Sequence, residues 1–437
     1  MLKLVSFLFV IAFVYADEQK HWALIVAGSE GWDNYRHQAD ACHAYQIMKK
    51  HGIPDERIIV MMYDDIAHNI ENPTPGIVIN RPNGPDVYHG VPKDYTHSEV
   101  TPKNFLAALT GDEEGLASRG LFGKKVIKSG PNDNVFVNFV DHGAPGILAF
   151  PEQFLHARDL MSAINKMHSE QKYAKMVFYI EACESGSMFQ DLLPKDINVF
   201  ATTAANAHES SYACYFDKKR RTYLGDVYSV MWMEDSDKED LQTETLQKQF
   251  LIVKEETNTS HCQEYGDMSI SNLDVAEFQG KMKSRTTSKY DRIRIPNPNF
   301  GAVKSEDVPL AIQYQSVKVA ETEEEKDKYL TKIAALEQKR TQTIETFRRI
   351  ISVSLNHDSW KVSEVMSSRM TLRNFDCYEP IVEALRQECP GLNIPQNDYA
   401  LRHLYTFVNL CEIHPRLDND EILDAISKVA EVPDSGC

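Results

Sequence analysis

Two short apolar runs, each ending in polar or small residues, organise the hydrophobic pattern of the chain. Residues 134–140 and 177–180 are long enough for buried strands and too short for typical helices. The first run ends in Asp141-His142-Gly143, and the second ends in Glu181-Ala182-Cys183. Neighbouring parallel strands of an α/β sheet end at one edge, where such folds place their ligands. The pattern therefore predicts that His142 and Cys183 lie side by side.

Strands and helices alternate on both sides of these runs. Residues 66–100 are rich in Pro, Asn and Gly and predict a long loop, which is usually functional in a compact domain. The alternation predicts an α/β fold with a mainly parallel sheet covered on both faces. The pattern predicts further strands at 22–27, 57–63 and 198–203, and helices at 40–51, 102–109 and 157–169.

The pattern changes after about residue 280, which predicts a domain boundary. A basic stretch is followed by Pro296-Asn-Pro-Asn-Phe-Gly301, which predicts an extended, exposed linker. From Glu323 apolar residues recur at helical spacing among Glu and Lys, so we expect helices to the end of the chain. The expected segments are a leader (1–16), an α/β domain (17–287), a linker (288–324) and a helical domain (325–437).

The net charge of the chain excludes one class of partner, and its first residues indicate the compartment. The chain has 437 residues and a net charge of −17, which argues against nucleic acid. Residues 1–16 have a positive start, an apolar core and a small-residue cleavage site, as in a secretory signal. Their apolar run is too short to span a bilayer, and no later stretch is long and apolar enough to span one. We expect a lumenal or secreted protein without a membrane anchor.

The number and positions of the cysteines fit a protein of the oxidising secretory pathway. Four of the eight cysteines lie in the last part of the chain, and in an oxidising compartment they predict two disulfides. Asn258-Thr259-Ser260 is an acceptor sequence for glycosylation. The remaining Cys and His residues do not stand in a closely spaced ligand pattern, so we expect neither a metal site nor a cofactor.

Cys183 and His142 are the pair that a cysteine peptidase needs. A thiolate attacks the carbonyl, and a nearby imidazole lowers the pKa of the thiol and then protonates the leaving amine. The backbone N–H groups of Gly143 and Cys183 are candidate donors to the oxyanion. The alternatives are a cysteine buried as a small hydrophobe and a structural histidine at a strand end.

Longer motifs resemble the legumain family of asparaginyl endopeptidases, which are relatives of the caspases. Examples are Gly31-Trp-Asp-Asn-Tyr-Arg-His-Gln-Ala-Asp-Ala-Cys-His43 and Tyr179-Ile-Glu-Ala-Cys-Glu-Ser-Gly186. Further matching stretches are 61–66, 72–76, 141–143, 201–205 and 209–213. The resemblance covers nearly the whole chain after the leader. It implies a caspase-like peptidase domain over 17–287 and a helical prodomain over 325–437, with disulfides Cys377–Cys411 and Cys389–Cys437.

The resemblance also implies a pocket for the side chain of Asn. A primary amide offers one acceptor and two donors, and the family pattern assigns Arg36 to its carbonyl and Asp226 to its NH₂ group. The alternatives are a surface ion pair for these two residues, a strand-end cap for Glu181 and a turn residue at Asn34. The other implied site residues are Glu181, Ser211 and His37 in the pocket wall, Ser210 at the peptide backbone, and Asn34 beside His142.

The implied activity is hydrolysis after Asn, and after Asp at acidic pH, by a zymogen that processes itself in acid. Implied partners are protein and peptide substrates, the chain's own prodomain and cystatin-type inhibitors; the implied location is the secretory pathway, in a lysosome, another acidic vesicle or the gut lumen. The alternatives are an asparaginyl ligase with the same site, a non-enzymatic module with this fold, and a permanent helical domain that dimerises. The linker residues after which self-cleavage is expected are Asp291, Asn297, Asn299 and Asp307.

Overall fold

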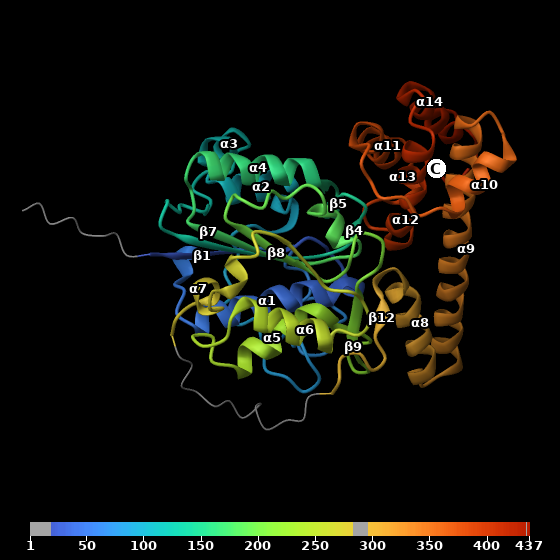
Figure 1. Ribbon diagram of the computed structural model, residues 1–437. Coiled ribbons are helices and arrows are strands. Elements are labelled where there is room, and N and C mark those ends of the chain that lie inside the picture. Colours follow the sequence, from blue (N-terminus) through green and yellow to red (C-terminus); the bar gives the residue numbers. More distant parts are fainter. Residues whose placement is uncertain (1–18, 283–295, 434) are drawn as a thin grey trace, which may run out of the picture.

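A computed structural model describes residues 19–282, 296–433 and 435–437 (Figure 1). The leader over 1–16, most of the basic stretch and the expected cleavage residue Asp291 lie outside the described residues. Within the described part of the chain, no helix is both long and apolar enough to cross a bilayer.

A six-stranded sheet forms the centre of the larger domain, in the order β11-β8-β7-β3-β1-β2. All neighbouring pairs are parallel except β11–β8. The sheet is therefore mainly parallel, as predicted. Its strands are β1 (His21–Ala27), β2 (Ile58–Met61), β3 (Asn134–Val140), β7 (Lys175–Glu181), β8 (Val199–Thr203) and β11 (Gln263–Gly266).

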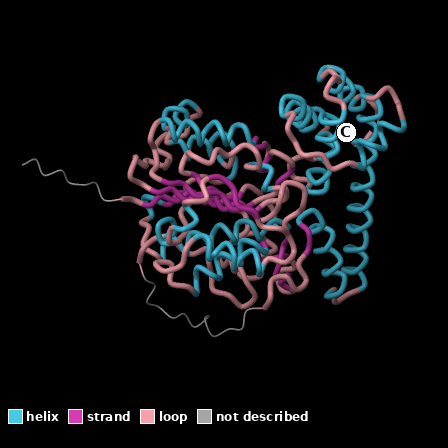
Figure 2. Tube along the Cα trace, viewed as in Figure 1, coloured by secondary structure: helices cyan, strands magenta, loops and turns pink. Residues whose placement is uncertain are grey.

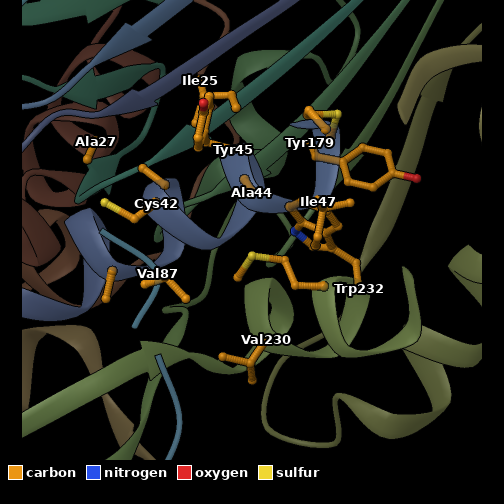
Figure 3. Packing of buried hydrophobic residues seen from close by; sticks show 14 of the residues in the cluster. Ile25, Ala27, Cys42, Ala44, Tyr45, Ile47, Val87, Tyr179, Val230 and Trp232 are labelled. Carbon is orange, nitrogen blue, oxygen red and sulfur yellow. The ribbon is translucent and has the colours of Figure 1, made fainter. Parts of the chain in front are cut away.

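Helices cover both faces of this sheet (Figures 1 and 2). Alternate residues of β1 belong to different cores because successive side chains of a strand point to opposite faces. Ile25 packs in the same cluster as Tyr45, Tyr179 and Trp232 (Figure 3), whereas Leu24 packs in the other core. One face carries α1 (Tyr35–Lys50), α5 (Val227–Lys238), α6 (Leu246–Glu256) and α7 (Ala276–Gln279), and the other carries α2 (Pro102–Thr110), α3 (Glu113–Ser118) and α4 (Ala157–Ser169).

Two small sheets lie beyond the carboxyl ends of the central strands. One has the order β4-β5-β6, and the other has the order β10-β9-β12. The second sheet contains a strand from after residue 300, so the two parts of the chain share a sheet. The strands are β4 (Gly143–Ala144), β5 (Ile147–Ala149), β6 (Phe154–His156), β9 (Tyr212–Asp217), β10 (Thr222–Asp226) and β12 (Val303–Lys304).

The C-terminal part is helical and has its own apolar core, in which Phe347 and Phe407 meet edge to face. The disulfides Cys377–Cys411 and Cys389–Cys437 brace it, as predicted. The long helix α9 begins at Glu323, where the helical pattern was predicted to begin. The helices are α8 (Val308–Val319), α9 (Glu323–Ser354), α10 (Ser359–Ser367), α11 (Phe375–Glu388), α12 (Asp398–His403), α13 (Tyr405–Ile413) and α14 (Asn419–Ala430).

The prediction of an extended linker is wrong for residues 303–319. They form β12, a 3₁₀ turn (Ser305–Asp307) and α8. Val308 and Ile312 bury their side chains in one cluster with Ala213 and Tyr223. Pro309 falls in the first turn of α8, where its missing N–H is not needed. The apolar contacts with the larger domain thus stabilise a helix where composition alone indicated a loop.

Candidate active site

The register of β3 and β7 brings His142 and Cys183 to the same edge of the sheet, as predicted. Val140 pairs with Glu181, and the N–H of Asp141 donates to the carbonyl of Glu181 at 3.0 Å. A Cβ atom at position 143 would lie 2.3 Å from the carbonyl oxygen of Cys183. Only glycine permits this close approach of the two strand ends.

Cys183 differs from the other free cysteines of the chain. Cys42, Cys214 and Cys262 lie inside an apolar core cluster, as cysteines that act as small hydrophobes do. Cys183 is only 5 % exposed but lies outside the apolar clusters of the described residues. The N–H of Ser211 donates to its Sγ at 3.3 Å.

The thiol of Cys183 is protonated in this form of the protein. Burial raises its pKa to about 12, and the carboxylate of Glu306 raises it further. Contacts with Ser211 and the charge of Arg402 act in the opposite direction. Glu306 and Arg402 both belong to the chain after residue 303, so charges from that part of the chain act on the thiol in opposite directions.

His142 is also engaged by residues from the C-terminal part. Its Nε2 lies 2.9 Å from Oδ1 of Asn34 and 3.1 Å from Oδ1 of Asp398, and its Nδ1 lies 3.3 Å from Oγ of Ser305. Burial, and then the charge of Arg36, hold the pKa of His142 well below its ordinary value, so the ring is neutral. Burial raises the pKa of Asp398 to about 8. Among the described residues, no hydrogen bond joins His142 to Cys183.

Arg36 and Asp226 form a buried ion pair, so the alternative of a surface pair is wrong. Nε of Arg36 donates to Oδ1 of Asp226 at 2.9 Å, and both side chains are at most 1 % exposed. Nη2 of Arg36 donates to Oγ of Ser305 at 2.9 Å. Burial raises the pKa of Asp226 and Arg36 opposes this effect. The pair lies beside His142, because Ser305 contacts both Arg36 and His142.

The remaining predicted residues surround this pair. Glu181 accepts from the N–H and the hydroxyl of Ser229 at 2.9 and 3.0 Å, which ties the end of β7 to the start of α5. The ring of His37 meets that of His142 edge to face at 4.7 Å. Ser210 is buried beside Glu306, and burial raises the pKa of that carboxyl. All the predicted site residues are therefore at or next to one edge of the sheet.

Four site residues were missed by sequence reasoning, namely Ser305, Glu306, Asp398 and Arg402. Val303 and Lys304 pair with Ala213 and Tyr212, and the N–H of Ser305 donates to the carbonyl of Ser211 at 3.0 Å. This segment is an added strand at the edge of the site. The sequence signal for it was Ser305-Glu-Asp followed by Val-Pro309, which is a typical helix start.

Two family models match the chain. The model of the peptidase C13 family matches residues 21–281, and the model of the legumain prodomain matches residues 329–430. The chain belongs to the peptidase C13 family. It is a cysteine peptidase that carries a prodomain, so the alternative of a non-enzymatic module is wrong.

Individual members of the C13 family match over most of their length. The chain is 53 % identical to legumain of Homo sapiens over 91 % of this chain and 90 % of that one. It is 41 % identical to hemoglobinase of Schistosoma japonicum over 91 % and 90 % of the two chains. It is 38 % identical to the vacuolar-processing enzyme of Vicia sativa over 95 % and 87 %.

Proposed function

We propose that the mature enzyme cleaves peptide bonds after Asn, with Cys183 as the nucleophile and His142 as the acid–base group. The observation that carries this proposal is the buried Arg36–Asp226 pair next to His142. Arg36 would donate to the side-chain carbonyl of Asn, and Asp226 would accept from its NH₂ group. An Asp side chain would be accepted in acid, because an ionised carboxylate is repelled by Asp226 whereas a protonated one mimics the amide.

The reaction begins when Cys183 passes its proton to His142. The thiolate attacks the scissile carbonyl carbon, and the N–H groups of Gly143 and Cys183 hold the oxyanion. The C–N bond breaks as His142 protonates the leaving amine, which leaves a thioester on Cys183. Water then hydrolyses the thioester, whereas an incoming amine would give ligation at the same site. Asn34, whose Oδ1 lies 2.9 Å from Nε2 of His142, would orient the ring.

The chain as translated is proposed to be a zymogen. Ser305 and Asp398 occupy the space around His142 and Arg36, and burial together with the carboxylate of Glu306 keeps the Cys183 thiol protonated. Arg340 on α9 anchors the segment 305–307, which contains Ser305. It donates to Oδ1 of Asp307 at 2.8 Å and to the carbonyl of Glu306 at 2.6 Å. A substrate therefore requires displacement of these residues.

Activation is proposed to occur by self-cleavage in an acidic compartment of the secretory pathway. Asn297 is exposed, whereas the amide of Asn299 donates to the carbonyl of Glu256 and Asp307 pairs with Arg340. Asn297 is thus the most accessible of the expected cleavage residues that the structure describes. Asn258 is exposed, as a glycosylated residue must be. Protein and peptide substrates and cystatin-type inhibitors are the proposed partners.

A digest of matched peptides tests the proposal. The acid-treated protein should cleave a peptide after Asn and spare the same peptide with Gln or Ala at that position. Asp should become a substrate as the pH falls. The Cys183→Ser variant should lose activity by on the order of 10⁴-fold or more, because a hydroxyl ionises far less readily than a thiol. Cleavage without preference for Asn, or near-normal turnover by Cys183→Ser, would contradict the proposal.

A further inference from the structure

Asp40 is a buried carboxyl group that the proposed mechanism does not use. It follows Arg36 by four residues on α1, so both side chains lie on the same face of the helix. Its Oδ2 accepts from the backbone N–H of Asp226 at 3.1 Å, and its Oδ1 accepts from Nδ2 of Asn80 at 2.6 Å. Asp40 therefore holds the backbone of Asp226, whereas Arg36 holds its side chain.

The side chain of Asp226 does not do what its position favours. Asp226 ends β10 and is the N-cap residue of α5, where an Asp side chain usually accepts from the first N–H groups of the helix. Here it makes no such bond. Its Oδ1 accepts from Arg36, and its Oδ2 has no hydrogen-bond partner of normal geometry among the described residues. Oδ2 is thus left for the NH₂ group of a bound Asn side chain.

Asn80 fixes Asp40 in turn. Nδ2 of Asn80 donates both to Asp40 and to the carbonyl of Leu224, at 2.6 and 2.9 Å. Because Nδ2 faces two acceptors, the orientation of the amide is determined, and Nδ1 of His43 donates to its Oδ1 at 2.8 Å. Nε2 of His43 lies 3.0 Å from Oδ2 of Asp237 on α5. The array joins the loop over 66–100 to α1, β10 and α5.

The packing around Asp40 is tight, and its charge suits its place. A Cβ atom at position 225 would lie 3.0 Å from both Oδ1 of Asp40 and Nδ2 of Asn80, so glycine is needed there. Burial raises the pKa of Asp40 well above its ordinary value, and the charge of Asp226 adds to this. Arg36 opposes the effect of burial at Asp226. A neutral Asp40 can therefore lie beside an ionised Asp226 without repulsion.

We propose that Asp40, held by Asn80 and His43, is a positioning residue for Asn specificity. It fixes the end of β10 so that Oδ2 of Asp226 faces the NH₂ group of the substrate's Asn. Without this hold, the end of β10 can shift and the Asp226 carboxylate can turn to cap α5. The inference rests on the proposed Asn pocket and extends it by residues that do not touch the substrate.

The test uses the mature enzyme with Asp40→Ala. Each variant is converted in acid by a trace of tagged parent enzyme, which is then removed. For a peptide with Asn before the cleaved bond, kcat/KM should fall by about 10–100-fold, mainly through KM, because the pocket binds the amide less well in the ground state too. Modification of Cys183 by methyl methanethiosulfonate, which carries no amide, should keep its parental rate.

A double-mutant cycle shows whether Asp40 acts through Asp226. In the Asp226→Ala background, Asp40→Ala should cause little further loss, because the group that it positions is absent. Asp40→Asn keeps the shape, the neutral charge and an acceptor for Asn80, so it should lose less activity than Asp40→Ala. If Asp40→Ala does not fold, Asn80→Ala tests the same array from the next residue outward.

The matched control is Asp235→Ala. Asp235 is a buried carboxyl of α5 that accepts from Gln249 at 2.9 Å, away from the pocket. Its loss removes a buried hydrogen bond of the same kind and should leave KM for the Asn peptide at the parental value.

Three outcomes would overturn the inference. These are a parental KM in both Asp40→Ala and Asn80→Ala, additive losses of Asp40→Ala and Asp226→Ala, and an equal rise in KM for Asp235→Ala. A parent enzyme without preference for Asn would instead contradict the proposed function. The two failures are therefore distinguishable, since only the second is visible in the parent.

Discussion

The chain after residue 303 contacts the catalytic domain at several points, and two of these contacts differ in burial. The inner contact consists of Ser305, Asp398 and Arg402 against Arg36, His142 and Glu184. The outer contact consists of Asp376, Glu379 and Glu383 against Arg158 and His156. The side chains of Glu184 and Arg402 are 1 % and 18 % exposed, whereas those of Arg158 and Asp376 are 44 % and 88 % exposed.

This difference in burial determines how much free energy each contact contributes to docking. An exposed ion pair contributes about 0–1 kcal/mol and is screened by salt. Removing one partner of a buried pair costs about 3–5 kcal/mol, because the other charge stays buried without compensation. The inner contact also engages Arg36 and His142, to which the proposed mechanism assigns roles. We infer that the inner contact keeps the enzyme inactive, while the outer contact adjusts how readily the prodomain leaves.

The largest effect is expected for Arg402→Ala. Arg402 pairs with Glu184 and donates to the carbonyl of His208 at 3.2 Å, so its loss leaves the Glu184 carboxylate buried without a partner. If this loss destabilises the docked prodomain by about 3 kcal/mol, the fraction of chains that have released it at neutral pH should increase on the order of 100-fold. Peptide hydrolysis by the intact chain measures this release. The matched outer variant Arg158→Ala should change it by less than about fivefold, and equal effects would contradict the comparison.

An intermediate effect is expected for Ser305→Tyr. Ser305 is 1 % exposed and lies between Arg36 and His142, so a phenol ring cannot fit without shifting β12. Overpacking of this kind costs about 1–3 kcal/mol and should raise hydrolysis by the uncleaved chain about tenfold. Mass spectrometry shows whether the chain is uncleaved. Ser305→Ala fits the same space and should have the smaller effect; no increase for Ser305→Tyr would exclude β12 as an inhibitory segment.

The smallest effect is expected for Glu383→Gln, and it depends on pH. A hydrogen bond from His156 lowers the pKa of Glu383, Arg386 adds to this, and burial opposes it. The ionised carboxylate therefore stabilises docking above its ordinary pKa of 4.5, and this contribution is lost as the pH falls through the lowered value. Glu383→Gln should reduce docking stability by at most about 1 kcal/mol at neutral pH.

The difference between Glu383→Gln and the parent chain should disappear in acid. Thermal unfolding of both chains in the Cys183→Ser background, from neutral pH to about pH 3, measures it without self-cleavage. A difference that persists or grows in acid would show that the carboxylate is not the group that loses its charge.

Sequence pattern predicted some elements closely and misread others for physical reasons. Helix α4 lies at the predicted residues, because its apolar positions follow one face. Helix α1 begins at Tyr35 rather than at the predicted Asp40, because Arg36 and His37 are polar residues that are buried in the site. Their burial hides the periodicity that marks a helix facing solvent on one side.

The sequence by itself determined the two central strands, the residues at their ends and the division into an α/β domain and a helical domain. These features depend on local runs of apolar side chains and on which residue follows each run. Only the tertiary structure decided that Arg36 meets Asp226, 190 residues away, and that Ser305 and Asp398 reach His142. Such contacts arise from the packing of distant segments and the removal of water from between them. Neither can be inferred from a local sequence pattern.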